Sequence, residues 1–406
     1  MAEHPPLTAV RRSIVVALCL VAIAGLSGVA RAAVPSEVPA DTHQVNGRVR
    51  SVVVVGDRVW MGGVFTQVQN GSGAKAQDVT NLAVLGRSTG APVGVTPLKL
   101  GGSGSQVWKL AVSGNTVYAA GKFTLSSGGA TYKNLLAFNG TTGALISSFR
   151  PKGIPNATAV AVSGSTVYVG RSKLQAVDAG TGAKKGSFAT STVATDPSLR
   201  GHNTPPQHRE FLLLGGWLYS ACQCDSLTQG GTTRGVKALV RFNPTTGAHD
   251  PGFTPAGAGV TATGISVATD GTNLYLGAGG SDYVARYSPS GAQAWKRDTS
   301  GSAQAVRVSG GDVLVGGHFV EIADAAGDGC GFKSGNPGTL DPNDECQTRN
   351  RLAAYSLGGG LLGWNPSVTG NYNGVWGIAL DGSSIHIGGE FRNVHGIRQT
   401  YYARLD

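Results

Sequence analysis

The sequence has few charged, aromatic and sulfur-containing side chains. Charged residues make up 14% of the 406 residues and aromatic residues 7%, with two Met and five Cys. Apolar residues reach 41%, enough for a sizeable buried core, so the composition excludes an extended disordered chain. The 63 Gly follow no three-residue period, which excludes a collagen-like fibre and indicates many turns instead.

Familiar catalytic and nucleotide-binding motifs are missing as well. The sequence contains no G-x-S-x-G, H-E-x-x-H or Walker motif, and the G-x-G at 257–259, a fragment of a nucleotide-binding motif, precedes no helix signal. No arginine-rich run with interleaved aromatic residues is present, so no nucleic-acid partner is predicted. The catalytic residues therefore stay unknown, and a non-catalytic chain is favoured over an enzyme.

The N-terminus has the features of a secretory signal. Arg11 and Arg12 precede an apolar or small-residue run at 13–30, and residues 30–32 read Ala-Arg-Ala, a typical cleavage site. We expect 1–32 to be a signal peptide that is cleaved after Ala32, leaving 33–406 as a secreted or cell-surface domain without a membrane span. A retained anchor is the alternative, because the apolar run is just long enough to span a bilayer.

The chain is basic, with a formal net charge of +10. Residues 1–32 contain three Arg and one Glu, so their removal leaves a net charge of +8 on 33–406. A basic exported protein suits partners such as a cell-wall polymer, a glycan or an envelope protein. A generally basic surface on a monomer explains the charge equally well.

Internal repetition is the strongest signal in the sequence. VWKLAVSGNTVYAAGKFT at 107–124, a loop and NLLAFNGTTGALISSFRP at 134–151 form one unit, and similar units recur along the chain. Each unit has four short runs with Gly, Ser or Asn turns between them, the pattern of an antiparallel meander. A Gly marks the first turn of each unit, at Gly56, Gly114, Gly164, Gly215, Gly271, Gly310 and Gly382. Seven such units predict an all-β protein with a single seven-bladed β-propeller of four-stranded antiparallel blades.

The two ends of the mature chain complement each other. The last unit stops at Asp406 after its third run, whereas 34–47 precede the first marker. We expect the mature N-terminal segment 34–47 to supply the outer strand of the seventh blade and so to close the ring.

The repeat units, including RLAAYSLGGGLLGWNP at 351–366, resemble the delta-60-type β-propeller repeats of secreted bacterial proteins. This resemblance covers nearly all of the mature chain and implies a fold without a general activity. A weaker similarity links 167–188 to the repeats of quinoprotein dehydrogenases. Those repeats end in Trp where this sequence has Phe188, and that family has eight blades.

Four Cys remain after cleavage, at Cys222, Cys224, Cys330 and Cys346. An even number in an exported chain predicts two disulfides with three possible connectivities. We favour Cys330–Cys346, which closes one loop and contributes about 3 kcal/mol. We also favour Cys222–Cys224, which requires a local bend because extended residues two apart lie near the upper Cα limit of about 6.8 Å. A redox or metal role for C-x-C is the alternative.

Three loops are predicted to form a functional rim, at 189–209, 222–235 and 321–349, because binding residues concentrate on loops of rigid scaffolds. The last loop is acidic, and its calcium candidates are Asp324, Asp328, Asp341 and Asp344. A solvated loop closed by a disulfide is the alternative, and no other cofactor is predicted. Three scattered His, at His208, His249 and His395, are interpreted as surface or turn residues. The six Trp are interpreted as core residues, with a sugar-stacking surface as the alternative.

Three functions are consistent with the sequence. The first is an exported non-catalytic propeller that acts as a binding or scaffold module at the cell envelope or outside the cell. The second is a propeller enzyme, either a quinone-dependent dehydrogenase, a lyase or a glycan-active enzyme. The third is a structural subunit of a cell-envelope assembly.

Overall fold

The computed structural model describes residues 1, 34–93, 99–200, 205–259, 261–325, 330, 346–370 and 374–406. The chain divides into two units, at 1–31 and 32–406, and all strands of the described residues lie in the second unit. The predicted signal peptide lies outside the described residues, apart from Met1. No helix within the described ranges has the length and apolar character that a membrane crossing requires.

The described chain is all-β apart from the four-residue helix α1 (Pro197–Arg200). Seven sheets in the described ranges share one plan, in which three consecutive antiparallel strands follow one another as a meander. The first strand of each sheet is β2 (Val49–Val55), β7 (Gly101–Ser113), β10 (Ala159–Ser163), β14 (Gln207–Leu214), β19 (Thr263–Thr269), β23 (Ala303–Ser309) or β29 (Gly374–Asp381). We call these seven strands the inner strands.

The second and third strands complete each meander. The second strands are β3 (Arg58–Gly63), β8 (Thr116–Ser127), β11 (Thr166–Gly170), β15 (Trp217–Gln223), β20 (Leu274–Gly279), β24 (Asp312–Gly317) and β30 (Ser384–Glu390). The third strands are β6 (Leu82–Gly86), β9 (Ala130–Asn139), β12 (Lys173–Asp178), β18 (Leu239–Phe242), β21 (Tyr283–Tyr287), β27 (Leu352–Ser356) and β33 (Tyr402–Leu405). A regular fourth strand follows in two sheets, as β13 (Ser191–Ala194) beside β12 and β22 (Gln293–Asp298) beside β21.

The predicted Gly markers all lie in the turns between first and second strands. Gly56 follows β2 and Gly382 follows β29, and all seven markers have positive φ, between 51° and 90°. Gly adopts this left-handed conformation without the steric cost that a Cβ imposes, and tight hairpins of this kind require it. The turn chemistry therefore sets the start of each repeat.

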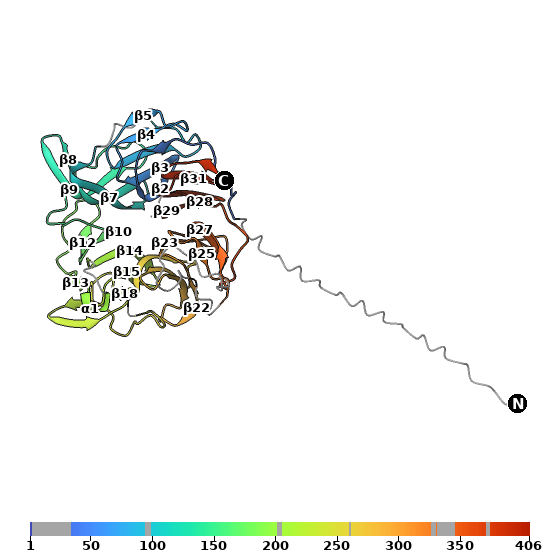
Figure 1. Cartoon of the computed structure of the whole chain (residues 1–406). Coiled ribbons are helices and arrows are strands. Elements are labelled where there is room, and N and C mark those ends of the chain that lie inside the picture. The colour runs from blue at the N-terminus through green and yellow to red at the C-terminus, as the bar shows by residue number, and fades with distance from the viewer. Residues whose placement is uncertain are drawn as a thin grey trace. The chain divides into compact units, whose positions relative to one another are not determined.

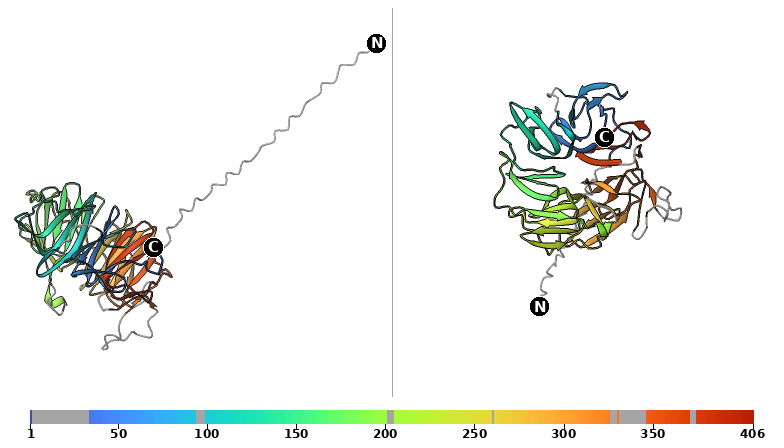
Figure 2. Two further views of the ribbon diagram at one scale, coloured as in Figure 1. Left: turned by 90° about the horizontal axis from the view of Figure 1, so that it is seen from above. Right: turned by 60° about the vertical axis from the view of Figure 1, so that its left-hand side comes forward.

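Inner strands of successive sheets lie against each other, giving a propeller-like arrangement. Each contacts the inner strand of the next sheet, and β2 contacts both β7 and β29. Figure 1 shows the last sheet, in red, beside the first, in blue. Seven clusters of buried apolar side chains each join two such neighbouring sheets, the first and last sheets included. Figure 2 shows the same succession from two further directions.

Aromatic side chains on second strands also link successive sheets by hydrogen bonds. Each donates to a carbonyl just after the third strand of the next sheet: Trp60 to Gly140, Tyr118 to Ala179, Tyr168 to Pro244 and Tyr219 to Pro289, at 2.9–3.2 Å. A buried phenol or indole needs such a partner, since an unpaired polar group in the core is costly. These four bonds constrain the position of one sheet relative to the next along the strand direction.

The segment that precedes β2 lies beside the last strand, where it had been predicted. Pro39 forms an antiparallel bridge with Leu405, and the Ala40 amide donates to the Arg404 carbonyl at 2.9 Å. Further on, β1 (Gln44–Val45) pairs with β4 (Gln67–Gln69) of the first repeat. The N-terminal segment therefore contacts strands from both the last and the first repeat.

The longer loops between second and third strands form small hairpins. These are β4 with β5 (Lys75–Asp78), β16 (Ser226–Gln229) with β17 (Thr232–Gly235), β25 (Glu321–Ile322) with β26 (Gln347–Thr348), and β31 (Asn393–Val394) with β32 (Ile397–Arg398). Three of them gain a further strand, from β1, from β13 and from β28 (Val368–Thr369). The third and fifth repeats have short connections here.

Candidate functional site

One residue from each repeat lines a cavity between the inner strands. Seven of the lining residues, which we call the central ring, are Arg50, Trp108, Thr158, Arg209, Ile265, Gln304 and Trp376. Lys109 also lines the cavity but is not counted in the ring. The cavity is narrow, with a volume of about 30 Å³. This exceeds the space one water needs, and a group of a few heavy atoms fills it.

Every residue of the central ring lies six positions before its hairpin Gly. On six inner strands the pairing register skips this residue; between Val49 and Ser51, for example, Arg50 has no partner on β3. The seventh, Thr158, lies immediately before β10. A bulge inserts one unpaired residue into a strand and redirects its side chain. The repeat thus delivers seven side chains, of five residue types, to one cavity.

Two arginines and two tryptophans dominate the central ring. The Arg50 guanidinium lies 3.7 Å from the Trp108 ring centroid and 5.3 Å from that of Trp376. Arg209 approaches Trp376 as well, at 5.8 Å. Cation–π contacts of this kind contribute about 0.5–2 kcal/mol and hold the guanidinium planes against the indoles. They leave the guanidinium N–H groups free to donate within their planes.

The two guanidinium groups are held in an unfavourable environment for positive charge. Desolvation lowers the pKa of Arg50 to about 9, and the nearby charges of Arg48 and Arg209 add to the effect, while Glu390 opposes it. Desolvation also lowers the pKa of Arg209 to about 10. Both still carry a full charge at neutral pH. Among the described residues, no carboxylate forms a salt bridge with either of them.

A buried ion cluster lies next to the central ring. Glu210, 5% exposed, accepts from Lys109 Nζ at 2.6 Å and from Arg307 Nη2 at 3.0 Å. Ser266 Oγ and the Val267 amide donate to its other oxygen. Desolvation raises the pKa of Glu210, but the charges of Arg307 and Lys109 outweigh it and lower the pKa to about 2. The cluster joins the inner strands β7, β14 and β23, which are not neighbours, and Glu210 is fully committed to it.

Polar atoms of the central ring remain unpaired in the described structure. Arg50 Nε and Trp376 Nε1 are buried donors without a partner, and Gln304 Oε1 is a buried acceptor without one. Arg50 is only 8% exposed, so its Nε has little access to bulk water. Buried polar groups in proteins are nearly always paired with protein, water or ligand. This cavity therefore has unused hydrogen-bonding capacity, with donors in the majority.

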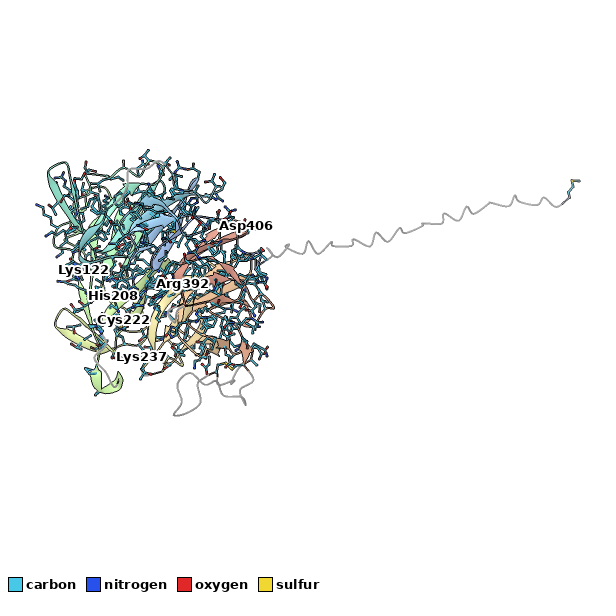
Figure 3. All side chains as sticks on the ribbon, turned by 45° about the horizontal axis from the view of Figure 1, so that its top comes forward. Lys122, His208, Cys222, Lys237, Arg392 and Asp406 are labelled. Carbon is cyan, nitrogen blue, oxygen red and sulfur yellow. A yellow bond between two sulfur atoms is a disulfide. The ribbon has the colours of Figure 1, made fainter. Side chains whose placement is uncertain are left out.

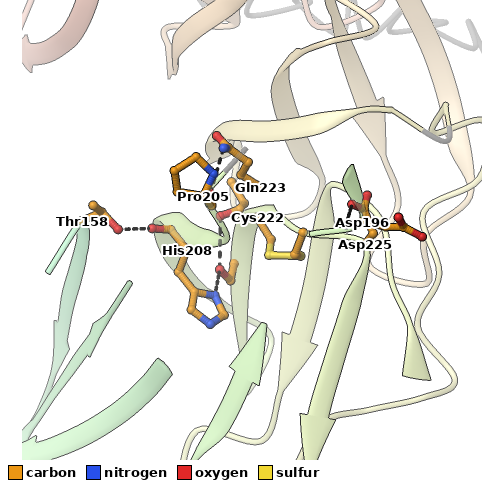
Figure 4. Close-up of a disulfide and its surroundings, with 10 residues drawn as sticks. Thr158, Asp196, Pro205, His208, Cys222, Gln223 and Asp225 are labelled. Atoms are coloured by element: carbon orange, nitrogen blue, oxygen red, sulfur yellow. Dashed lines mark hydrogen bonds between the residues drawn. A yellow bond between two sulfur atoms is a disulfide. The ribbon is translucent and has the colours of Figure 1, made fainter. Parts of the chain in front are cut away.

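The prediction for His208 is wrong, because this residue is fully buried rather than at the surface. Its Nδ1 lies 2.7 Å from Ser220 Oγ, and its backbone carbonyl accepts from Thr158 of the central ring at 2.6 Å (Figure 4). Desolvation lowers its pKa to about 3, so the imidazole is neutral at pH 7. It packs between two sheets, a position that its sequence neighbours do not reveal.

Both favoured cysteine pairs lie at bonding distance. Cys222 and Cys224 form a disulfide with Cα atoms 5.4 Å apart, shorter than extended residues allow, so the chain bends there (Figure 4). Cys330 and Cys346 form the second, with a Cα separation of 5.8 Å. Figure 3 places Cys222 near His208 in the folded unit. The described C-x-C pair is a disulfide in this structure.

Two of the three predicted rim segments come together. Strand β13, from 189–209, pairs with β16, from 222–235, and Asp196 N donates to Asp225 at 2.7 Å. Of the calcium candidates, Asp324 is described, whereas Asp328, Asp341 and Asp344 lie outside the described residues, so the calcium site stays a prediction. Within the described ranges, no three His, Cys, Asp or Glu side chains lie close enough to hold a metal ion.

Five of the six Trp fall into two groups, and the sixth, Trp217, is partly buried against Arg241. Three are buried as predicted, at Trp60, Trp295 and Trp364. Trp108 and Trp376 are only partly buried because their bulges turn them toward the central cavity. The sequence analysis missed the central ring, although a signal existed in the constant six-residue offset from each hairpin Gly.

The basic charge is unevenly distributed along the chain. Between Asp78 and Asp178 the sequence has nine Lys and Arg and no acidic residue. Two hollows in this region share Lys133 and are lined by Lys122 in one and by Arg150 and Lys152 in the other; Figure 3 labels Lys122. The charge is therefore concentrated on the second and third repeats rather than spread evenly.

No family model and no curated protein matches the chain, so the delta-60-type resemblance stays a prediction. Three solved structures with similar folds are each 13% identical over 90% of this chain. They are the computationally designed Ika8 protein (92% of it covered, TM-score 0.47), the extracellular domain of BT4673 from B. thetaiotaomicron (39%, 0.49) and BamB from Moraxella catarrhalis (98%, 0.45). At these scores, none of the similarities bears on the function of this chain.

Proposed function

We propose that this chain is an exported, non-catalytic binding module at the cell envelope or outside the cell, and that its ligand binds at the central ring. The observation that carries the proposal is the ring itself. Seven repeats place side chains around one cavity, six of them on bulges, and no carboxylate among the described residues forms a salt bridge with either guanidinium group there. A purely structural interior favours paired charges, because an unpaired buried charge costs several kcal/mol.

The chemistry of the ring favours binding over catalysis. Its side chains supply cations, indole faces, an amide and a hydroxyl, which recognise ligands. The adjacent Glu210 is a weak base because its pKa is held at about 2 by two cations. A general acid or base works best with a pKa near the working pH.

The proposed architecture is a closed seven-bladed propeller. Three features support it: seven sheets of one plan, the contact of β29 with β2, and the bridge of Pro39 with Leu405. Export after cleavage near Ala32 is supported by the two disulfides, which persist in oxidising compartments. The basic second and third repeats suit an anionic partner such as a cell-wall polymer or an acidic glycan.

Two measurements test the proposal. Native mass spectrometry of the protein from its host's medium should give the mass of 33–406 less four hydrogens. Fractions of the host envelope should then change the fluorescence of Trp108 and Trp376. This change should vanish in the Trp108→Phe, Trp376→Phe double variant and persist in Trp217→Phe, a matched control whose indole packs on Arg241. A change that depends on Trp217 instead, or no response to any fraction, would overturn the proposal.

A further inference from the structure

We propose that the central ring binds one carboxylate group of its ligand between Arg50, Arg209 and Trp376. This inference rests on the proposed function and names the chemistry that the same site selects. The rest of the ligand lies outside the narrow cavity, which admits only the acidic group.

Charge is the first argument. Arg50 and Arg209 bring two positive charges to the ring, and no ring residue is acidic. The nearest carboxylates are engaged elsewhere, since Glu210 binds Lys109 and Arg307 and Glu390 binds Arg48. Within the described part of the chain, no carboxylate forms a salt bridge with either ring guanidinium, so the ring favours an anion from solution.

Donor geometry is the second argument. Arg50 Nε and Trp376 Nε1 are both buried and unpaired, and the two residues share a cation–π contact at 5.3 Å. These two N–H donors, which no acceptor among the described residues satisfies, suit the two oxygens of a carboxylate. A guanidinium presents its N–H groups as a planar fork, which matches a planar carboxylate better than a spherical ion.

Size is the third argument. A cavity of about 30 Å³ accommodates a group of carboxylate size. A sulfate or phosphate, with four oxygens in a tetrahedron, is larger and less suited to a slot between guanidinium and indole planes. The adjoining Lys109 cannot serve as a second anion site, because its Nζ is bound to Glu210 at 2.6 Å.

The carboxylate has two possible sources, a small free acid or an acidic sugar of a polymer. The mature protein is titrated at pH 7 and constant ionic strength with sodium acetate, sodium galacturonate and an oligogalacturonate, and with sodium chloride and sodium sulfate for comparison. Binding is followed by tryptophan fluorescence and calorimetry. Saturable binding of acetate assigns a free acid, whereas binding of the uronates alone assigns an acidic sugar.

Variants place the binding at the ring. Arg209→Gln and Arg50→Gln should each weaken carboxylate binding by about tenfold or more, the loss of one charge-assisted hydrogen bond. Arg392→Gln is the matched control, because Arg392 also lies over an aromatic ring, that of Tyr401. It should bind carboxylates normally because Arg392 lies outside the central ring. Arg209 is the more exposed of the two, and its variant keeps the test valid if Arg50→Gln fails to fold.

Several outcomes would overturn the inference. The inference fails if none of the carboxylates shows saturable binding, if sulfate or chloride binds with equal affinity, or if Arg209→Gln binds carboxylates as wild type does. If an envelope fraction still acts through Trp108 and Trp376 while no carboxylate binds, the carboxylate assignment fails and the proposed function stands. If neither binds, both fail.

Discussion

Replacing Glu210 by Gln should destabilise the protein substantially, because it leaves two buried cations without a counter-charge. The difference between the ordinary pKa of 4.5 and the value of about 2 corresponds to about 3 kcal/mol of stability at pH 7. Removing one partner of a buried ion pair costs a similar amount, about 3–5 kcal/mol. We therefore expect the free energy of unfolding to fall by about 3 kcal/mol, measured by urea denaturation with tryptophan fluorescence.

The loss of unfolding free energy caused by Glu210→Gln should depend on pH in a defined way. Because the folded pKa of Glu210 is lowered, its stabilising contribution is complete above about pH 4.5 and disappears as the pH falls toward 2. The difference between wild type and Glu210→Gln should therefore be constant from pH 7 to 5 and shrink below that. Adding Lys109→Met to Glu210→Gln should recover part of the loss, since one unpaired cation is then removed.

Asp78→Asn provides the matched control. Its carboxylate also pairs with a lysine, Lys75, at 3.2 Å, but both side chains are more than half exposed. The change should stay within about 0.5 kcal/mol, as for most surface ion pairs. The reasoning is refuted if Glu210→Gln is no less stable than this control, or if its deficit is as large at pH 2 as at pH 7.

Three further changes test other parts of the structure. Tyr219→Phe removes the hydrogen bond to the Pro289 carbonyl and should cost about 0.5–1.5 kcal/mol in urea denaturation; no loss would mean that the bond contributes nothing between sheets. His208 is neutral when folded, so protonation of the unfolded chain should reduce stability by about 1.4 kcal/mol per pH unit as the pH falls from 6.5 toward 3, and His208→Gln should remove that slope. Replacing Cys330 and Cys346 together by Ser removes the disulfide between two residues 16 positions apart and should lower the free energy of unfolding by about 3 kcal/mol. Unchanged stability would show that this disulfide does not constrain the unfolded chain.

The repeat plan could be predicted because its signals are local. A turn with positive φ selects Gly, so Gly56 and its six counterparts mark the hairpins in the sequence itself. Cys222 and Cys224 are two residues apart, and their pairing requires only a bend. The N-terminal segment beside β33 could also be predicted, because a missing strand at one end and a spare segment at the other complement each other.

The central ring could not be predicted by looking for a motif, because its members have no common chemistry. Arg50, Thr158 and Ile265 occupy equivalent places yet share neither charge nor shape. What the ring residues share is a position relative to the hairpin, and the bulge that unpairs six of the seven appears only in the strand register. The burial of His208 likewise depends on the neighbouring sheet, where Thr158 and Gly170 lie about forty to fifty residues earlier in the sequence.

The bulges also have a consequence for how such a protein changes over generations. A residue that takes no part in strand pairing can be replaced without breaking a backbone hydrogen bond of its own sheet. The six bulged ring positions can therefore vary without loss of a strand hydrogen bond, while Gly turns and buried aromatic residues keep the scaffold constant. Single substitutions at these positions offer a short route from one ligand to another, both for natural selection and for directed evolution in the laboratory.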